Sequence, residues 1–177
     1  DNQDQYIDCL IENTKRNIGS EKFNQIKNQS LELIKRDIQD DLSEFGVLFD
    51  SWFSEESMDK NGELDRAIQS LKKKDYLYEK DGATWFKATD LGDEKDRVVI
   101  RKNQNKTYFT SDIVYHHNKK ERGFDTLIDI LGSDHHGYIA RVKAGLEAMG
   151  HNSDDLDVQL VQFVSPVSYT HLRAHET

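Results

Sequence analysis

The stretch that most constrains the fold runs from Gly132 to Tyr138 and reads Gly-Ser-Asp-His-His-Gly-Tyr. An apolar run, Leu127 to Leu131, comes directly before it. A helical pattern with apolar residues at three- and four-residue spacing follows it and ends at Gly150. A strand, a glycine turn and a helix in this order predict a binding corner of an open α/β sheet, because such sheets hold ligands at the carboxyl ends of their strands.

The polar groups of this corner suit a ribose or a phosphate. Asp134 stands at the predicted start of the helix, where its carboxylate could accept hydrogen bonds from a ribose diol. Gly132 and Gly137 would let a ligand approach the backbone, and His135 and His136 could donate hydrogen bonds or stack. A helix cap with two surface histidines explains the same residues without a ligand.

A second polar group precedes the corner. We expect Tyr108 at the end of a strand and Asp112 in the first turn of a helix that Thr110 or Ser111 caps. Tyr115 follows one turn later on the same face. A carboxylate flanked by phenols could bind a cationic ligand head, bidentately if that head is a guanidinium. Helix capping is the simpler explanation of Asp112.

Four histidines lie close together in the sequence without the spacing of a metal site. They form two adjacent pairs, at positions 116–117 and 135–136. Adjacent helical residues point about 100° apart, and no H-x-x-x-H or H-E-x-x-H spacing links the pairs. We therefore assign no residue to a metal.

Composition bounds the class of protein. The net charge of −9 over 177 residues argues against a protein that coats nucleic acid through its overall field, although a local basic patch is compatible with it. Cys9 is the only cysteine, which excludes an internal disulfide and fits a reducing compartment, so we expect the cytoplasm. No stretch of the sequence suits a membrane span. The chain starts at Asp1 without a methionine or signal peptide, so we expect it to begin inside a longer protein.

The apolar pattern divides the chain into four segments. Residues 1–46 are predicted to be helical, with a break at Gly19-Ser20 where Ser20 would cap the second helix. Residues 47–106 are predicted to be a mostly β module with one short helix. Residues 107–164 are predicted to be a helix-strand-helix-strand unit with a parallel sheet, whose apolar strand faces would be partly exposed. Residues 165–177 lack any period and resemble translated vector sequence, so we treat them as a non-native tail.

Within the mostly β module, several elements have clear local signals. We expect strands over 47–53, 98–101 and 107–109, a hairpin over 76–86, and a charged loop over 91–97. An Asn61-Gly62 turn precedes the short helix, and Lys72-Lys73-Lys74 closes it, where cations suit the negative end of the helix dipole.

Five stretches together resemble arginyl-tRNA synthetase of the bacterial type, a class I aminoacyl-tRNA synthetase. They are Tyr76 to Ala83, Gly92 to Val98, Thr107 to His116, Glu121 to Asp125, and Gly132 to Tyr138. Each is weak alone, but their joint order and spacing are specific, and the likeness runs from about residue 30 to 164.

The resemblance implies an α/β fold and an activity. The family's catalytic domain is a Rossmann fold split by a connective insertion, and it couples arginine to its tRNA through an arginyl-adenylate with ATP and Mg²⁺. Residues 47–106 would be the connective insertion, and residues 107–164 the second half of the Rossmann fold. The partners implied are arginine, ATP and the tRNA for arginine, with no membrane.

The resemblance also implies roles for single residues. The family's arginine pocket uses a tyrosine and an aspartate spaced like Tyr108 and Asp112, so Asp112 would bind the guanidinium, and Tyr115 and His135 would lie beside it. The ATP side would be formed by Gly132, Asp134 and His136.

The sequence departs from the family pattern in three ways. The two ATP signatures, of His-Ile-Gly-His and Lys-Met-Ser-Lys type, are not in the chain, and neither is the tRNA-reading helical domain. Asn118 stands where the family often has aspartate. We therefore expect an internal fragment that holds no catalytic residue and has no activity alone.

Two other functions are compatible with parts of the sequence. Asp134-His135-His136 suggests a metal-dependent phosphoesterase of the Asp-His-His class, although the upstream aspartate motifs of that class are missing. The hairpins with Lys72 to Lys74 suggest a nucleic-acid-binding module without catalysis.

Overall fold

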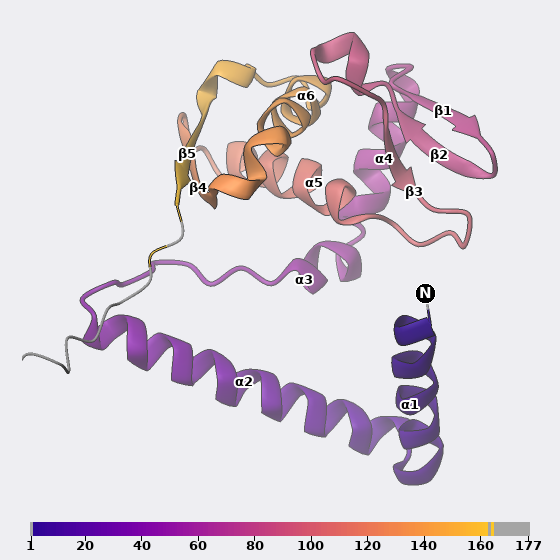
Figure 1. The fold of residues 1–177 in the computed structure, drawn as a ribbon, viewed down its shortest axis with the longest axis vertical. Coiled ribbons are helices and arrows are strands. Elements are labelled where there is room, and N and C mark those ends of the chain that lie inside the picture. The colour runs from indigo at the N-terminus through magenta and orange to yellow at the C-terminus, as the bar shows by residue number, and fades with distance from the viewer. Residues whose placement is uncertain (1, 163, 165–177) are drawn as a thin grey trace, which may run out of the picture. The chain divides into compact units, whose positions relative to one another are not determined.

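The computed structural model of the chain describes residues 2–162 and 164, and its contacts divide the chain into two units (Figure 1). The first unit is Asp1–Phe53 and the second is Ser54–Thr177. The predicted tail, residues 165–177, lies outside the described residues.

The first unit consists of two helices, α1 (Asn2–Ile18) and α2 (Ser20–Glu44). The break falls at Gly19, whose φ of 84° is a left-handed value that glycine adopts without strain. Gly19 is also the N-cap of α2, so the prediction that Ser20 caps this helix is wrong. No residue of α2 is buried, and the side chains of its apolar stripe, such as Leu33 and Ile34, are exposed.

The strand predicted over 47–53 is also wrong, because this segment is irregular. Its alternation of apolar and polar residues is suitable for a strand, but none of the described residues pairs with it. An extended segment without a partner leaves its backbone groups to water, so it gains no stability as a strand.

The second unit begins with two short helices and an antiparallel sheet. These elements are α3 (Glu55–Lys60), α4 (Glu63–Lys73), β1 (Leu77–Lys80), β2 (Ala83–Phe86), a 3₁₀ turn η1 (Ala88–Leu91) and β3 (Arg97–Ile100). The strands pair in the order β1-β2-β3. Asp81 and Gly82 both have positive φ, as the two-residue turn of a hairpin requires. The predicted hairpin, the strand after it and the short helix are therefore confirmed.

The rest of the second unit holds the predicted crossover. Its elements are α5 (Tyr108–Glu121), β4 (Leu127–Gly132), a 3₁₀ turn η2 (Ser133–Tyr138), α6 (Ile139–Met149), a 3₁₀ turn η3 (Ser153–Asp155) and β5 (Leu156–Val161). Strands β4 and β5 are parallel, with Leu127 opposite Leu156 and Gly132 opposite Val161. The predicted strand-helix-strand order is confirmed, while Phe163, the predicted last residue of β5, lies outside the described residues.

Helix α5 begins earlier than the sequence pattern indicates. Its first residue is Tyr108, so the strand predicted over 107–109 is wrong. The Thr107 hydroxyl donates to the backbone oxygen of Val98 over 2.9 Å, and the Thr110 hydroxyl donates to that of Val99 over 2.7 Å. These bonds hold the start of the helix against β3. The N-cap is Thr107, so the prediction that Thr110 or Ser111 caps this helix is wrong. Asp112 therefore lies in the second turn rather than the first.

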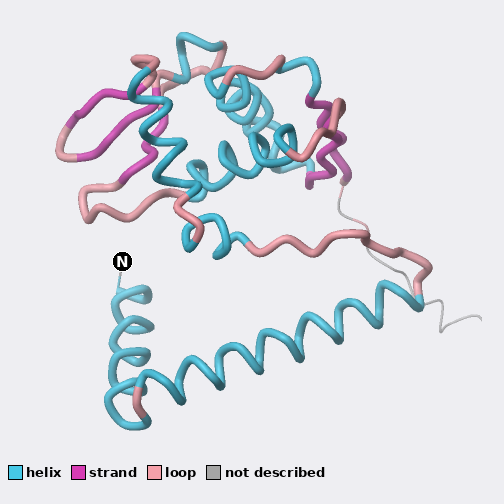
Figure 2. Tube along the Cα trace, turned by 180° about the vertical axis from the view of Figure 1, so that it is seen from behind, coloured by secondary structure: helices cyan, strands magenta, loops and turns pink. Residues whose placement is uncertain are grey.

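Helices α5 and α6 lie between the two sheets (Figures 1 and 2). One cluster of buried residues packs these helices against β2, β3 and α4; it comprises Leu71, Phe86, Ala88, Val99, Phe109, Ile113, Ala144 and Ala148. A second packs α6 against the parallel pair; it comprises Leu127, Val142, Leu146 and Leu156. The other face of β4 is open: Ile128 and Ile130 are 62% and 72% exposed, which confirms the predicted exposure of apolar strand faces.

Gly145 sets how closely α5 and α6 approach. A Cβ at this position would lie 2.6 Å from Cγ1 of Ile113, whose side chain is buried. Gly145→Val is therefore expected to lower the free energy of unfolding by about 2 kcal/mol through overpacking. Urea denaturation measures this loss, and Gly137→Val is the matched control because a Cβ there meets nothing within 4 Å. Equal losses in the two variants would show that α5 and α6 are not in close contact at Gly145.

Candidate functional site

A cavity of about 710 Å³ opens where the start of α5, the turn η2 and α6 meet the loop before β3. Four of the residues predicted to bind ligands line it, namely Tyr108, Asp112, Asp134 and His135. The remaining lining residues are Glu94, Lys95, Arg97, Leu131, Gly137, Tyr138 and Arg141. Residues from two separate sequence groups therefore share one cavity.

Asp112 is the half-buried acid of this cavity. Burial raises the pKa of its carboxyl group to about 6, and the nearby charges of Glu55 and Asp129 act in the same direction. His116 and Arg141 oppose the shift but do not cancel it. Among the described residues, none donates a hydrogen bond to the Asp112 carboxylate. A half-buried carboxylate without a donor is suited to a cationic ligand that brings its own N–H groups.

The two predicted tyrosines lie in different surroundings. Tyr108 is 78% exposed and stands at the cavity's rim, as the first residue of α5. Tyr115 is half-buried, and the Lys119 ammonium lies 4.5 Å from the centre of its ring. Tyr115 is not among the cavity's described lining residues, so the structure does not bring the two phenols together around Asp112.

The corner after β4 is formed by the turn η2. Asp134 and His135 are exposed, with 3.8 Å between Oδ2 of Asp134 and Nε2 of His135, and the His135 ring stands edge-on to Tyr138. Gly132 has an ordinary extended backbone, and a Cβ there would lie 2.5 Å from Oδ1 of Asp134. The space that Gly132 leaves is therefore taken by the Asp134 carboxylate. Gly132 and His136 are absent from the described lining of the cavity.

The sequence pattern missed Arg141, which lines the cavity from the first turn of α6. Its guanidinium carbon lies 5.1 Å from the ring centre of Tyr138 and 5.9 Å from that of Phe109. Its Nε is buried and has no hydrogen-bond partner among the described residues. Burial lowers the pKa of Arg141, and the charge of Arg97 adds to this effect. The spacing of Arg141 from Tyr138 is the signal that could have revealed it, because residues three apart on a helix are neighbours.

The segment over 91–97, which was predicted to be a charged loop, contains a largely buried ion pair. Arg97 donates from Nε and Nη2 to the two carboxylate oxygens of Asp93, each over 2.6 Å. Asp93 is buried, yet the bonds from Arg97 and from the Glu94 backbone outweigh that burial and lower its pKa. Arg97 is thus held at the cavity wall with its charge already balanced.

Comparison with known proteins decides the family. The model of the class I tRNA synthetase (R) catalytic domain matches residues 8–166. The chain belongs to this family. The match begins before residue 30, where the sequence resemblance was expected to start, and so it includes most of both N-terminal helices.

Relatives of this synthetase domain are arginine–tRNA ligases. The enzyme of Legionella pneumophila (strain Corby) is 51% identical over 158 residues, and that of Hydrogenovibrio crunogenus is 53% identical over 161 residues. These matches cover 89% and 91% of the chain but 27% of each relative, so the chain spans about a quarter of their length. A crystal structure described as a putative arginyl-tRNA synthetase from Campylobacter jejuni matches with a TM-score of 0.77 at 36% identity, and it covers 90% of this chain and 36% of that one. The predicted family and its α/β fold are confirmed.

A buried network holds the cavity wall of this synthetase domain in place. His116 contacts the backbone oxygen of Asp112 through Nδ1, over 2.7 Å, and Oδ2 of Asp129 through Nε2, over 2.6 Å. Lys119 donates to Oδ1 of Asp129 over 2.9 Å. Both partners of the His116 ring are acceptors, so both contacts are satisfied only when each ring nitrogen carries a hydrogen. The network ties the second turn of α5 to β4 and so positions Asp112.

Proposed function

We propose that the chain forms part of the catalytic domain of a cytoplasmic arginine–tRNA ligase, which joins arginine to its tRNA through an arginyl-adenylate. Within that enzyme, Asp112 binds the guanidinium of arginine, with Tyr108 and His135 at the same cavity. The observation that carries the proposal is the meeting of Tyr108, Asp112, Asp134 and His135 in one cavity. The names of the relatives supply the substrate class.

The Asp112 carboxylate is chemically suited to this role. A guanidinium presents parallel N–H donors that match a carboxylate bidentately, whereas the ammonium of lysine is a single point charge. Binding supplies the hydrogen bonds that Asp112 lacks among the described residues, and it adds an opposite charge to those of His116 and Arg141. The ligand would thus offset the desolvation that raises the carboxyl pKa to about 6.

The nucleotide side of the cavity suits a nucleoside. The Asp134 carboxylate is exposed and could accept from a ribose diol. Gly132 leaves space for that carboxylate, and His136 belongs to the same turn, η2. Of the cavity's cations, Arg97 is occupied by Asp93. Arginine's own carboxylate is the nucleophile towards the α-phosphate, so this chain contributes by positioning.

The described residues of the cavity form no group of three side chains that would hold Mg²⁺ without the nucleotide. Within the described part of the chain, one group of three side chains could hold a metal, and two of its members are histidines. Mg²⁺ prefers oxygen ligands and keeps several waters. We therefore assign Mg²⁺ to the triphosphate and derive no step through it.

No structural observation favours the two other functions. The metal-capable group contains none of Asp134, His135 and His136, as far as the chain is described, which gives no support to a phosphoesterase. Lys72 and Lys73 lie in the last turn of α4, and Lys74 donates to the backbone oxygen of Ala148 over 3.0 Å. These lysines therefore lie at the C-terminal ends of α4 and α6, where a positive charge stabilises the helix dipole.

The proposal is tested by arginine-dependent exchange of pyrophosphate into ATP. The full-length protein that contains this segment is expected to show exchange and to charge tRNA with arginine. The 177-residue chain is expected to show none, because it carries neither ATP signature. Exchange by the purified 177-residue chain would contradict the division of the site, and full-length protein that charges another amino acid would contradict the assignment of substrate.

A further inference from the structure

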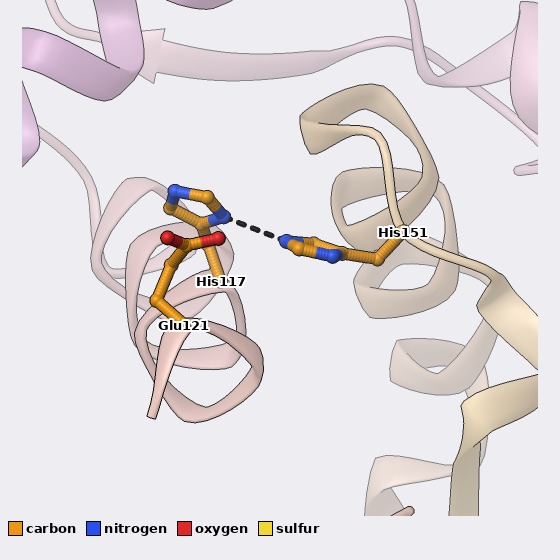
Figure 3. Close-up of side chains that lie close together, drawn as sticks. All are labelled: His117, Glu121 and His151. Carbon is orange, nitrogen blue, oxygen red and sulfur yellow. Dashed lines mark hydrogen bonds between the residues drawn. The ribbon is translucent and has the colours of Figure 1, made fainter. Parts of the chain in front are cut away.

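Three side chains outside the cavity converge on one point, as Figure 3 shows. His117 and Glu121 are four residues apart on α5 and therefore share one face. His151 follows Gly150, the left-handed C-cap of α6. Sequence spacing could not reveal this group, because 34 residues separate the two histidines and only the packing of α5 against α6 brings them together.

The distances suit a small cation. Nδ1 of His117 and Nε2 of His151 lie 2.7 Å apart, and the ligand atoms of all three residues lie within 4.8 Å of one another. Ligands of a tetrahedral zinc ion at ordinary bond lengths are about 3.3 Å apart. The two imidazoles would have to separate by roughly half an ångström to admit an ion of that size. Glu121 is exposed, so its carboxylate can move to complete the set.

The protonation of the two histidines also fits ligation. Burial lowers the pKa of His117, and the charge of His151 adds to this effect. Burial likewise lowers the pKa of His151, although the Glu121 charge opposes it. Neutral imidazoles are the form that binds metals. Their hydrogen bond needs a hydrogen on one of the two facing nitrogens, so metal binding requires that ring to adopt its other tautomer.

The surroundings give an ion access to the group. His117 and Glu121 line a cavity of about 460 Å³, which shares no lining residue with the cavity of Asp112. Asn118 lines the same space; its Nδ2 donates to Glu63, while its buried Oδ1 has no partner in the described part of the chain. A water on the ion's open position could donate to that oxygen.

We propose that His117, Glu121 and His151 form a binding site for a divalent cation of the zinc class, which links α5 to the residue that follows α6. Two imidazoles and a carboxylate are the donor set that such ions accept with one position left open. The cavity that holds Asp112 lies at the start of α6, whereas this site would lie at the end of α6 and fix that end to α5. It is independent of the proposed ligase function.

The test is calorimetric titration of Zn²⁺ into the metal-stripped 177-residue chain at about pH 7.5, where neutral imidazole predominates. One site is expected, and His151→Gln and Glu121→Gln should each weaken it at least tenfold. The matched controls are His136→Gln and Glu147→Gln, which should bind as the unmodified chain does. A zinc concentration about 100-fold above Kd should raise Tm by about 5 °C or more in the unmodified chain and not in His151→Gln.

Two further measurements test whether His151 is a ligand of the ion. Co²⁺ in place of Zn²⁺ should give the visible absorption of a tetrahedral site, which His151→Gln abolishes. His151→Cys should retain zinc binding, because a thiolate is also a zinc ligand. Unchanged affinity in His151→Gln, with its helical circular dichroism intact, would overturn the proposal. So would loss of the site in His136→Gln alone, because it would place the ion at the corner after β4.

Discussion

Asp112→Asn in the full-length protein is expected to lower kcat/KM for arginine by about 100- to 1000-fold, which corresponds to roughly 3–4 kcal/mol. The asparagine keeps the shape of the side chain but removes the charge that a guanidinium needs. It also places an amide N–H₂ where an acceptor stood. Arginine-dependent pyrophosphate exchange over a range of arginine concentrations measures the loss.

Asp134→Asn is the matched control for this loss. Both residues line the cavity, but Asp134 is assigned to the ribose and not to the guanidinium. Its substitution should raise KM for ATP and leave KM for arginine nearly unchanged. If both variants affect arginine alike, or if Asp112→Asn leaves KM for arginine unchanged, Asp112 is not the guanidinium ligand.

The pH dependence of arginine binding follows from the same carboxyl group. With a pKa of about 6, Asp112 is mostly protonated at about pH 5 and mostly ionised at about pH 8. Arginine should therefore bind the full-length protein about tenfold more weakly at the lower pH, and Asp112→Asn should remove that difference.

The stability of the fold should depend on Asp112 in the opposite sense. Its folded pKa of about 6 lies above the ordinary value of 3.8, so the ionised group destabilises the native state above about pH 6. This cost disappears as the pH falls below about 4, where both states are protonated. Asp112→Asn should therefore raise Tm at about pH 8 and leave it unchanged at about pH 4, as measured by thermal unfolding of the 177-residue chain.

The residues of the cavity illustrate what sequence can predict. The order of strand, turn and helix around Gly132 placed Asp134 and His135 at the end of β4, because strand ends and helix starts have strong local signals. The spacing of Tyr108 and Asp112, together with the family resemblance, predicted that these two residues bind a ligand, and both line the cavity. The spacing of Arg141 from Tyr138 was the one signal for this residue, and it was missed because the nearby ring of Phe109 comes from α5 and only the folded chain brings it there.

The two strands that were predicted wrongly share one physical cause. The segment over 47–53 has the alternation of a strand but no partner strand among the described residues. The segment over 107–109 also alternates, yet Phe109 packs beside Ile113 of the next turn, and the hydroxyls of Thr107 and Thr110 bond to β3. Tertiary contacts that only the folded chain provides decided both cases.

Replacing Asp129 with alanine is expected to lower the free energy of unfolding by about 3–5 kcal/mol at neutral pH. Asp129 bonds to both His116 and Lys119, and the side chains of Asp129, His116 and Lys119 are only 13%, 5% and 17% exposed. Without the carboxylate, the His116 ring would lose a buried hydrogen-bond partner and the Lys119 ammonium would be left partly buried with no opposite charge, which costs more than the lost hydrogen bonds alone. Urea denaturation of the 177-residue chain measures the loss, and Asp157→Ala on β5, an exposed position, should change stability by less than about 0.5 kcal/mol.

Acid titration separates this electrostatic loss from simple loss of packing. Burial alone would raise the pKa of Asp129, but the hydrogen bonds and charges of His116 and Lys119 hold it at about 2, below the ordinary 3.8. The stabilisation by Asp129 is therefore fully present above about pH 4 and is lost as the pH falls towards about 2. The unfolding free energies of Asp129→Ala and of the unmodified chain should converge over that window. A difference that stays constant down to about pH 2 would instead assign the loss to packing.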